Sequence, residues 1–375
     1  MHHLDCDVLL IALARIEQDA RTLNLARALA EAGMQVVVIA AASSAARDAS
    51  FRVIPWDDPG GSALQRWRSL SRFVRTQRIR PRVVGAMDFF ALVQARAMAR
   101  RCDVPLFYDM REFTFALGPL QGRGWKQRVI SAIERWALRD VDRVIVSGPL
   151  DAKVVHERYQ LPELPTVVMN TPPYQPRVPS TILRDRFSIP ADHAVVIYQG
   201  VVHHGRGIEP FLRALPLMPD VHLCVVGDGP ARDELRTRAM TSLTSPAAAR
   251  VHWMDSVPYD QLHPITCSAT IGLCTIEPVS MSYEYALPNK LFEYMMAEIP
   301  SIVTDLPALR AQLAEIPAGI LVGRGQEATE LADAVRRLRQ PATAAAMAEQ
   351  ARRVRSISYD QQARRVVDLV RDLLR

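Results

Sequence analysis

The sequence predicts two α/β domains in tandem, each built on a doubly wound parallel sheet. Three observations predict this: the chain length, the alternation of short apolar runs with helical segments in both halves, and a proline-rich break between them. At 375 residues the chain is long enough for two domains of ordinary size. The composition, 49% apolar and 23% charged with a net charge of +6, is globular and excludes wholesale disorder or a fibrous repeat.

The first half, residues 1–173, alternates strand-type with helix-type segments. A helix is predicted from Asp19 to Ala32, because apolar residues recur at helical spacing and Gly33 provides a C-terminal stop. Such alternation indicates parallel strands covered by helices. The predicted strands are Val8–Leu13, Gln35–Ala40, Arg82–Ala86, Leu106–Tyr108, Arg143–Val146 and Thr166–Met169.

A proline-rich break separates the halves. It begins at Asn170 and contains four prolines up to Pro179, so residues 174–193 are predicted to be a linker. The alternation then restarts in a second domain, residues 194–355. Its predicted strands are Ala194–Tyr198, His222–Val226, Val251–Trp253, Thr270–Cys274, Ser301–Thr304 and Ile320–Val322.

Several function classes are excluded by missing motifs. Residues 13–21, between the first predicted strand and helix, contain no glycine, whereas a dinucleotide-binding dehydrogenase needs Gly-x-Gly-x-x-Gly there. A Walker loop, a Gly-x-Ser-x-Gly elbow and a His-Glu-x-x-His helix are absent as well. Without a Cys-x-x-Cys pair or carboxylates at metal-ligand spacing, no metal and no resident cofactor is expected.

The longest continuous apolar runs, Val8–Ala14 and Val36–Ala42, are far shorter than the roughly 18–20 residues of a membrane-spanning helix. The first seven residues lack the pattern of a secretory signal. We therefore expect a cytoplasmic protein, and we expect no nucleic-acid partner.

The segment Ala286–Pro300 carries the most informative pattern. Pro288 suits the first position of a helix, and the free amides and dipole at a helix start attract anions. Asn289, Lys290 and Glu293 share one helical face through their i, i+3 and i, i+4 spacing. The lysine could neutralise a diphosphate, and the carboxylate could accept two hydrogen bonds from a ribose diol. A surface helix with an incidental Lys–Glu pair is the alternative.

Two more loops of the second half have ligand-type composition. The first strand of that half is followed by Gly200 and Arg206, where a strand end meets a helix start and an anion can bind. The next strand is followed by Gly227 and Asp228, in a turn that lets the backbone approach a ligand closely. Three such loops at strand ends favour a ligand site over coincidence.

Together these segments resemble the retaining glycosyltransferases of family 4. The resemblance runs over Arg206-Gly207, Val226–Gly229 and above all Ala286-Leu-Pro-Asn-Lys-Leu-Phe-Glu-Tyr294. In the first half it includes Tyr108-Asp-Met-Arg-Glu112. It implies the GT-B fold, in which two Rossmann-like domains face each other across a cleft and a C-terminal helix, here residues 356–375, crosses back to the first domain.

The resemblance also implies roles for individual residues. Arg206 and Lys290 match positions that hold the donor diphosphate, and Glu293 matches the glutamate that grips the ribose. Asp109 and Arg111 are expected to face the cleft and orient the acceptor, with a structural ion-pair cluster as the alternative. The predicted donor-binding residues are Gly200, Gly227, Asp228, Glu284, Tyr285, Leu287, Pro288, Asn289 and Glu293.

The chain departs from the family pattern in four places. Tyr285 stands where the first glutamate of Glu-x(7)-Glu is expected, with Glu284 displaced by one. Arg111 replaces a frequent histidine, and Val201 replaces the usual arginine after the first glycine. Glu298 precedes Ile-Pro where glycine is common. These departures keep a non-catalytic binding protein open as an alternative.

The function expected from the resemblance is transfer of a sugar from a nucleotide-sugar donor to an acceptor, with retention of anomeric configuration and without a metal. The acceptor would be a glycan, a lipid-linked molecule or a small molecule. Another GT-B enzyme, such as a nucleotide-sugar epimerase, is a further alternative.

The segment Ser62–Gln77 predicts an amphipathic helix, with an apolar stripe on one side and Arg68, Arg72 and Arg75 on another. Such a helix could bind the anionic inner face of a membrane peripherally. In the alternative, the stripe packs on the first domain and the arginines are solvated.

Overall fold

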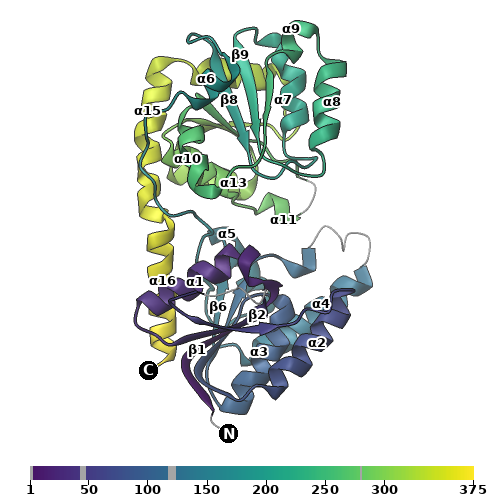
Figure 1. Cartoon of the computed structure of the whole chain (residues 1–375), viewed down its shortest axis with the longest axis vertical. Helices are drawn as coiled ribbons and strands as arrows, with labels where there is room; N and C mark the ends of the chain where they lie inside the picture. Colours follow the sequence, from purple (N-terminus) through teal and green to yellow (C-terminus); the bar gives the residue numbers. More distant parts are fainter. Residues whose placement is uncertain (1–2, 43–47, 117–123, 279–280) are drawn as a thin grey trace. The chain divides into compact units, whose positions relative to one another are not determined.

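The computed structural model divides the chain into two compact units, Met1–Asn170 with Asp360–Arg375 and Thr171–Tyr359. It describes residues 3–42, 48–116, 124–278 and 281–375. Each unit contains one sheet whose strands are all parallel (Figure 1). The predicted α/β fold class is therefore confirmed.

The sheet of the first unit has seven strands in the order β3-β2-β1-β4-β5-β6-β7. All six strands predicted for this half are present. Three of them, β1, β4 and β5, are longer than predicted, and β7 is shorter. The strands are β1 (Leu4–Arg15), β2 (Val36–Ala41), β3 (Arg52–Trp56), β4 (Ile79–Ala86), β5 (Leu106–Met110), β6 (Arg143–Val146) and β7 (Thr166–Val167).

The sequence did not predict strand β3. It lies at the edge of the sheet and pairs only with β2. Its proline, Pro55, lacks an N–H, which an edge strand tolerates because one side of its backbone needs no partner. Trp56 at its end is 2% exposed, so burial of one large side chain compensates for a weak strand pattern.

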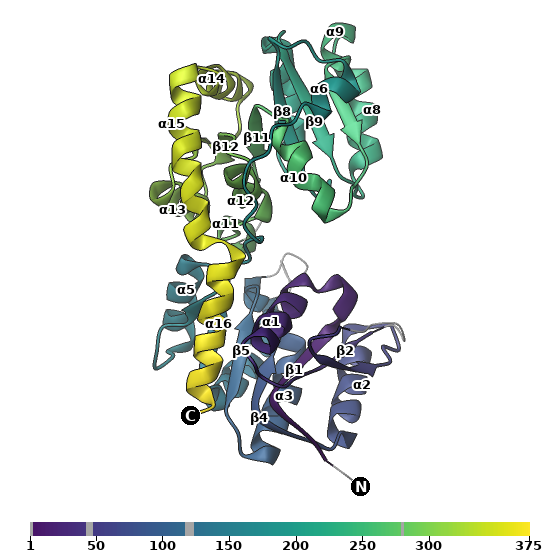
Figure 2. The same ribbon diagram turned by 60° about the vertical axis from the view of Figure 1, so that its left-hand side comes forward.

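Helices cover both faces of the first sheet (Figures 1 and 2). Helices α1 (Ala20–Glu31) and α16 (Tyr359–Leu373) pack on one face, where their apolar side chains join those of β1 and β2 in one core. The other face is covered by α2 (Ala63–Thr76) and α3 (Phe89–Cys102), and α4 (Gly124–Ala137) packs beside α3. The unit also contains α5 (Pro149–Tyr159).

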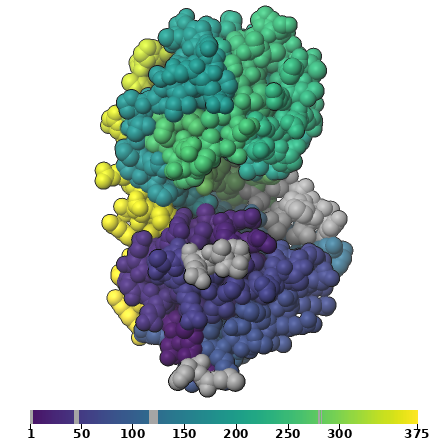
Figure 3. Space-filling model, viewed as in Figure 1, coloured from purple at the N-terminus to yellow at the C-terminus, as the bar shows by residue number. Residues whose placement is uncertain are grey.

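Helix α16 is the predicted returning helix, and its presence is confirmed. It buries Val366, Val367 and Val370 against the first sheet. The amide oxygen of Gln362 accepts a hydrogen bond from the backbone N–H of Met169 at 3.0 Å. In Figure 3 the yellow atoms of this segment lie against the purple atoms of the first unit. Helix α16 therefore completes the hydrophobic core to which β1 and α1 contribute.

The second unit has a sheet in the order β10-β9-β8-β11-β12-β13. Its strands are β8 (Ala194–Gln199), β9 (Val221–Val226), β10 (Val251–Met254), β11 (Ile271–Cys274), β12 (Ser301–Thr304) and β13 (Gly319–Val322). The strand order reverses between β8 and β11, and ligands of open α/β sheets bind at the carboxyl ends of the strands beside such a switch point.

Two layers of helices cover the second sheet. The helices are α6 (Ile182–Phe187), α7 (Ile208–Ala214), α8 (Arg232–Ser242), α9 (Ser245–Ala248), α10 (Tyr259–Cys267), α11 (Met281–Glu284), α12 (Asn289–Met296), α13 (Pro307–Glu315), α14 (Ala328–Leu338) and α15 (Pro341–Ala351). The predicted linker, residues 174–193, lies within this unit and contains α6. Leu183 of α6 is fully buried, and its N–H donates to the hydroxyl of Ser268.

Three histidines form a row near the amino ends of β8, β9 and β10. Nδ1 of His193 lies 3.0 Å from Nε2 of His222, whose Nδ1 lies 2.8 Å from Nε2 of His252. Burial and the neighbouring His252 lower the pKa of His222 to about 4. Burial also lowers the pKa of His252, so the row favours neutral imidazoles at His222 and His252.

This row predicts acid-sensitive stability. Since the pKa of His222 in the folded state lies below its unfolded value of about 6.5, the unfolded state binds the proton more readily. The contribution of His222 to the free energy of unfolding should be constant above about pH 6.5 and be lost as the pH is lowered toward 4. Urea unfolding of the wild type and His222→Gln at pH 7 and pH 5 measures this. We expect the free energy of unfolding to fall less between pH 7 and pH 5 in His222→Gln than in the wild type. Equal falls in the two proteins would contradict the low pKa of His222.

Candidate functional site

The loops after β8 and β9 pack so closely that they require glycine. Gly227 has φ +141°, and a Cβ atom there would lie 2.1 Å from the carbonyl oxygen of Gly200. Gly229 has φ +159°, and its Cβ would lie 2.3 Å from the carbonyl oxygen of Val202. Side chains are thus excluded at positions 227 and 229, and backbone lines the carboxyl edge of the sheet there.

Arg206 lies in the loop that leads into α7. Its guanidinium lies 4.6 Å from the centre of the Tyr283 ring and donates to the Tyr283 hydroxyl at 3.3 Å. The next residue, Gly207, has φ +80°, and a Cβ there would lie 1.7 Å from Oγ1 of Thr275. This close approach fixes the loop against the end of β11 and thereby positions the arginine.

Lys290 projects from the first turn of α12. The helix begins at Asn289 with Pro288 as its N-cap, so Pro288 lies one residue before the helix and not at its first position, where the sequence pattern had placed it. The Lys290 ammonium lies 3.6 Å from the centre of the Tyr198 ring. Burial, with a contribution from the charge of Arg206, lowers the pKa of Lys290 to about 8. Asn289 beside it is exposed.

Neither cation of this pair is neutralised by an ion pair with a carboxylate among the described residues. Aromatic rings hold the guanidinium of Arg206 and the ammonium of Lys290 through cation–π contacts. Such contacts are weaker than a buried ion pair, and they leave the positive charge available to a ligand. Arg206 is also close enough to Lys290 for its charge to lower the pKa of the lysine. A bound anion would relieve that repulsion, so the arrangement is suited to a phosphate group.

Glu293 lies one turn further along α12 in a polar network. Gln199 Nε2 donates to its carboxylate at 2.6 Å, and Thr266 Oγ1 donates to Gln199 Oε1 at 2.7 Å. The Tyr259 hydroxyl also hydrogen-bonds Glu293, whose pKa burial raises. These groups surround a cavity of about 10 Å³, room for one water molecule.

Sequence patterns did not identify Gln199, Thr266 or Tyr259 as partners of Glu293. They come from β8 and α10, far from α12 in the sequence, and no motif spacing connects them. The structure does bring Lys290 and Glu293 into the same site at one end of the sheet, together with Arg206.

The remaining predicted donor residues lie in the turn after β9 and in the segment around the start of α12. Glu284 forms an ion pair with Arg324 at 2.9 Å, a partner that the sequence did not suggest. Asp228 is exposed and accepts from the backbone N–H of Gly229 at 3.0 Å. Tyr285 lies in the turn after α11, and Leu287, like Pro288, is half-buried.

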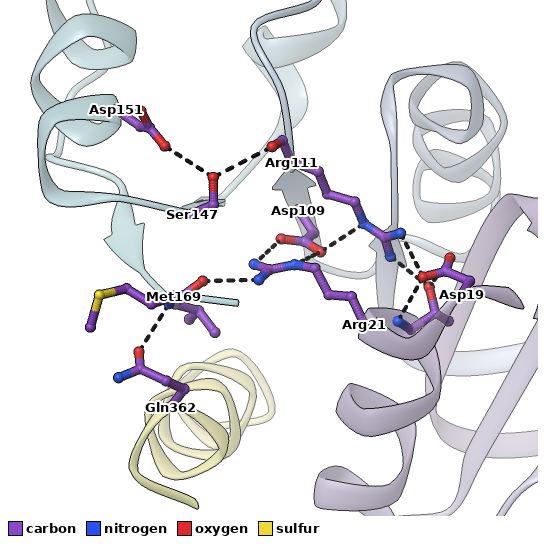
Figure 4. Close-up of polar contacts among 10 residues, drawn as sticks. Asp19, Arg21, Asp109, Arg111, Ser147, Asp151, Met169 and Gln362 are labelled. Atoms are coloured by element: carbon purple, nitrogen blue, oxygen red, sulfur yellow. Dashed lines mark hydrogen bonds and ion pairs between the residues drawn. The ribbon is translucent and has the colours of Figure 1, made fainter. Parts of the chain in front are cut away.

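In the first unit, Asp109 lies at the centre of an ion-pair cluster (Figure 4). Arg21 binds it with two hydrogen bonds, Nε to Oδ2 at 2.8 Å and Nη2 to Oδ1 at 2.7 Å, and also donates to the carbonyl oxygen of Val168. Arg111 Nε donates to Oδ2 at 3.2 Å. Asp109 is fully buried, and the two arginines outweigh burial and lower its pKa.

Arg111 extends the cluster to the start of α1. It donates to Asp19 Oδ1 at 2.7 Å and to the Thr22 hydroxyl at 2.6 Å. Asp19 also caps α1 by accepting from the Thr22 N–H. The structure therefore places both Asp109 and Arg111 within an ion-pair cluster that fastens α1 to β5, the arrangement given above as the alternative to an acceptor contact.

Ser147 borders this cluster. Its hydroxyl donates to Asp151 Oδ2 at 3.0 Å, and the carbonyl oxygen of Arg111, at 3.4 Å, is a second possible acceptor for the same proton (Figure 4). Burial raises the pKa of Asp151 to about 6. Within the described ranges, no three His, Cys, Asp or Glu side chains are grouped so that they could hold a metal ion.

Two family models match the chain. A Glycosyl transferase 4-like domain matches residues 18–171, and a Glycosyl transferases group 1 domain matches residues 193–340. The chain belongs to the family-4-type glycosyltransferases. The second match contains the cation pair and Glu293, so the loops described above lie within a glycosyltransferase domain.

Solved structures of this glycosyltransferase fold are similar over nearly the full chain. Sucrose-phosphate synthase from Thermosynechococcus elongatus is 19% identical, with a TM-score of 0.74 and 99% of each chain covered. HepE from Anabaena in complex with UDP-glucose is 16% identical, with a TM-score of 0.72 and coverage of 98% of this chain and 100% of that one. No curated protein matches the sequence.

A third similar structure is WaaG, described as a glycosyltransferase involved in lipopolysaccharide biosynthesis. It is 16% identical, with a TM-score of 0.69 and coverage of 97% of this chain and 99% of WaaG.

None of the described helices of our glycosyltransferase is long and apolar enough to cross a membrane.

Proposed function

We propose that this glycosyltransferase moves a hexose from a UDP-sugar to an acceptor hydroxyl, with retention of anomeric configuration and without a metal ion. The observation that carries the proposal is the half-buried pair Arg206 and Lys290, two cations beside the start of α12 with aromatic rather than acidic partners among the described residues. A nucleoside diphosphate leaving group supplies the anion that such a pair lacks.

The choice of UDP is supported by similar structures. HepE is described in complex with UDP, with UDP and glucose, and with UDP-glucose. We assign Glu293 to the ribose, because its carboxylate lies one helical turn from Lys290, and Gln199 and Tyr259 hold it in place. Glu284, Tyr285 and Leu287 lie in the segment before α12 and would adjoin the donor sugar.

The chemistry follows from where charge develops. The bond between the anomeric carbon and the diphosphate oxygen breaks, and the diphosphate keeps the electron pair. The acceptor oxygen bonds to the same face of the sugar and passes its proton to the leaving phosphate. Arg206, Lys290 and the amino end of α12 stabilise the negative charge that grows on the diphosphate. Such electrostatic stabilisation is the largest contribution to rate expected from a preorganised site.

The acceptor is a glycan, a lipid-linked molecule or a small molecule. Asp109 and Arg111 would act on the acceptor side by fixing α1 against β5, because Asp109 is fully buried and both residues are engaged in the ion-pair cluster. The second candidate function is a non-catalytic sugar-nucleotide-binding protein. It is favoured by Tyr285, which stands in place of an acidic residue.

Turnover of UDP-glucose separates these functions. We expect conversion to UDP in the presence of an acceptor extract, unchanged when EDTA is added, because cations of the protein balance the leaving charge. Release of UDP that stops with EDTA and returns with Mn²⁺ would contradict metal independence. Binding of UDP-glucose without release of UDP would favour the non-catalytic alternative.

Glu293→Gln should retain the fold and weaken UDP binding. A charge-assisted hydrogen bond to the ribose contributes roughly 1.5–3 kcal/mol, about 10- to 100-fold in affinity. Calorimetric titration with UDP measures the change. Glu315→Gln, the same substitution at an exposed site on α13, is the matched control and should bind like the wild type. An unchanged dissociation constant for Glu293→Gln would remove the ribose assignment.

We further propose that the enzyme is cytoplasmic and contacts the anionic leaflet peripherally, through α4 more than through α2. In α2, Leu70 and Val74 are buried, so much of its apolar stripe packs inside the unit while Arg68, Arg72 and Arg75 remain exposed. Helix α4 instead exposes apolar side chains at i, i+4, i+8 and i+11. These are Trp125, Val129, Ile133 and Trp136.

Cations flank the exposed stripe of α4. By helical spacing, Lys126 lies on one side of it and Arg128 and Arg135 on the other, and its one acidic residue, Glu134, is fully buried. Trp125 is 68% exposed and Val129 49%. A helix with exposed tryptophan and a cationic border suits the interface of an anionic bilayer.

Liposome flotation tests this contact. We expect binding to vesicles with anionic lipid, weakened in Trp125→Ser/Val129→Ser and in the triple change of Arg68, Arg72 and Arg75 to Gln. Leu164→Ser, at another exposed apolar position of the first unit, should bind like the wild type. Equal recovery on neutral vesicles, or full binding by both variants, would overturn the proposal.

A further inference from the structure

A second and larger cavity lies at the opposite end of the second sheet from the donor loops. Its volume is about 420 Å³, within the usual range for small-molecule sites. The segments 267–270 and 298–300 line it, and they lead into the amino ends of β11 and β12. The donor loops follow the carboxyl ends of strands, so this cavity is a separate site.

Two different segments form the walls of the cavity. One wall comes from the chain that enters the second unit and contributes Arg177, Ser180 and Arg184. The other wall is α15, which contributes three alanines whose small side chains leave the space open. These are Ala344, Ala345 and Ala348. The cavity thus combines a basic polar wall with an apolar wall.

The two arginines carry unbalanced charge. Arg184 donates to the carbonyl oxygens of Pro190 at 2.7 Å and His193 at 2.9 Å, which hold its guanidinium in place. Arg177 donates to the carbonyl oxygen of Glu298 at 3.4 Å. Across the described part of the chain, neither arginine has a carboxylate within ion-pair distance. The backbone carbonyls accept hydrogen bonds from both guanidinium groups but do not neutralise their positive charges.

The acid that lines the cavity does not balance them. The carboxylate of Glu298 forms an ion pair with Arg352 at 3.1 Å. Glu298 has φ +52°, a conformation that costs a residue other than glycine about 1 kcal/mol or more. A side chain at this position is needed for the contact with Arg352, which gives a reason for the glutamate that the sequence left unexplained.

We propose that this cavity is a binding site for a small organic anion, a phosphate monoester or carboxylate with a compact apolar body. The anionic group would bind Arg177 and the Ser180 hydroxyl beside Arg184, because charge-assisted bonds to arginine are the strongest that the cavity offers. The apolar body would lie on the alanines of α15. The site uses none of the residues assigned to the sugar nucleotide and goes beyond the proposed function.

Phenyl phosphate is a suitable ligand for testing this site on the full chain. Calorimetric titration is performed in an Arg206→Ala background, which weakens binding of the anion at the donor loops. We expect binding there as in the wild type, and at least about tenfold weaker binding when Arg177→Gln is added. Inorganic phosphate should bind more weakly than phenyl phosphate, and neutral benzyl alcohol should not compete.

A pair of variants on α15 tests the location. Ala344→Leu fills the cavity and should also weaken binding about tenfold or more, whereas Ala346→Leu, exposed on the same helix and outside the cavity lining, should bind normally. Thermal unfolding of each variant confirms that it is folded. Full binding by Arg177→Gln and Ala344→Leu, loss of binding in Arg206→Ala alone, or no binding at millimolar phenyl phosphate would overturn the proposal.

Discussion

The placement of two cations over aromatic rings, without an ion-pair partner in the described parts of the chain, is the physical constraint on which the donor site depends. Lys290 is held over Tyr198 and Arg206 over Tyr283. Burial makes the charge of Lys290 costly, as its pKa of about 8 shows. The protein without a ligand bears this electrostatic cost, and a bound anion lowers it. The site therefore favours the binding of a phosphate group.

The loops of the second sheet serve this arrangement. Gly207 approaches Thr275 so closely that no side chain fits, and Gly227 packs in the same way on Gly200. The strand ends are therefore held together by backbone contacts, and the cation positions follow from that packing. In the first unit, by contrast, the arginines have acidic partners, because Asp109 and Asp19 neutralise the charges of Arg21 and Arg111. That cluster is suited to fixing structure and leaves little charge for a ligand.

Much of the fold followed from local patterns. Every predicted strand is present, because buried parallel strands give continuous apolar runs. Helix α1 agreed closely, since Asp19 caps it and Gly33 follows its end. Strand β3 was missed because Pro55 weakens its pattern while the burial of Trp56, a tertiary effect, stabilises it.

The site was less predictable than the fold. Lys290 and Glu293 could be assigned together because one helix carries both. The contacts of Gln199 with Glu293 and of Arg324 with Glu284 join segments distant in the chain, and no sequence spacing reports them. The exposed apolar stripe of α4 was also overlooked, because amphipathic periodicity alone does not show whether a stripe is covered.

The most direct test of the cation pair compares UDP with uridine. Calorimetric affinities of both ligands for the wild type and for Arg206→Ala/Lys290→Ala isolate the contribution of the diphosphate. The account predicts that the wild type binds UDP far more tightly than uridine, and that the double variant loses most of this difference, by about 100-fold or more, while its affinity for uridine stays the same. An undiminished preference for UDP in the double variant would contradict it.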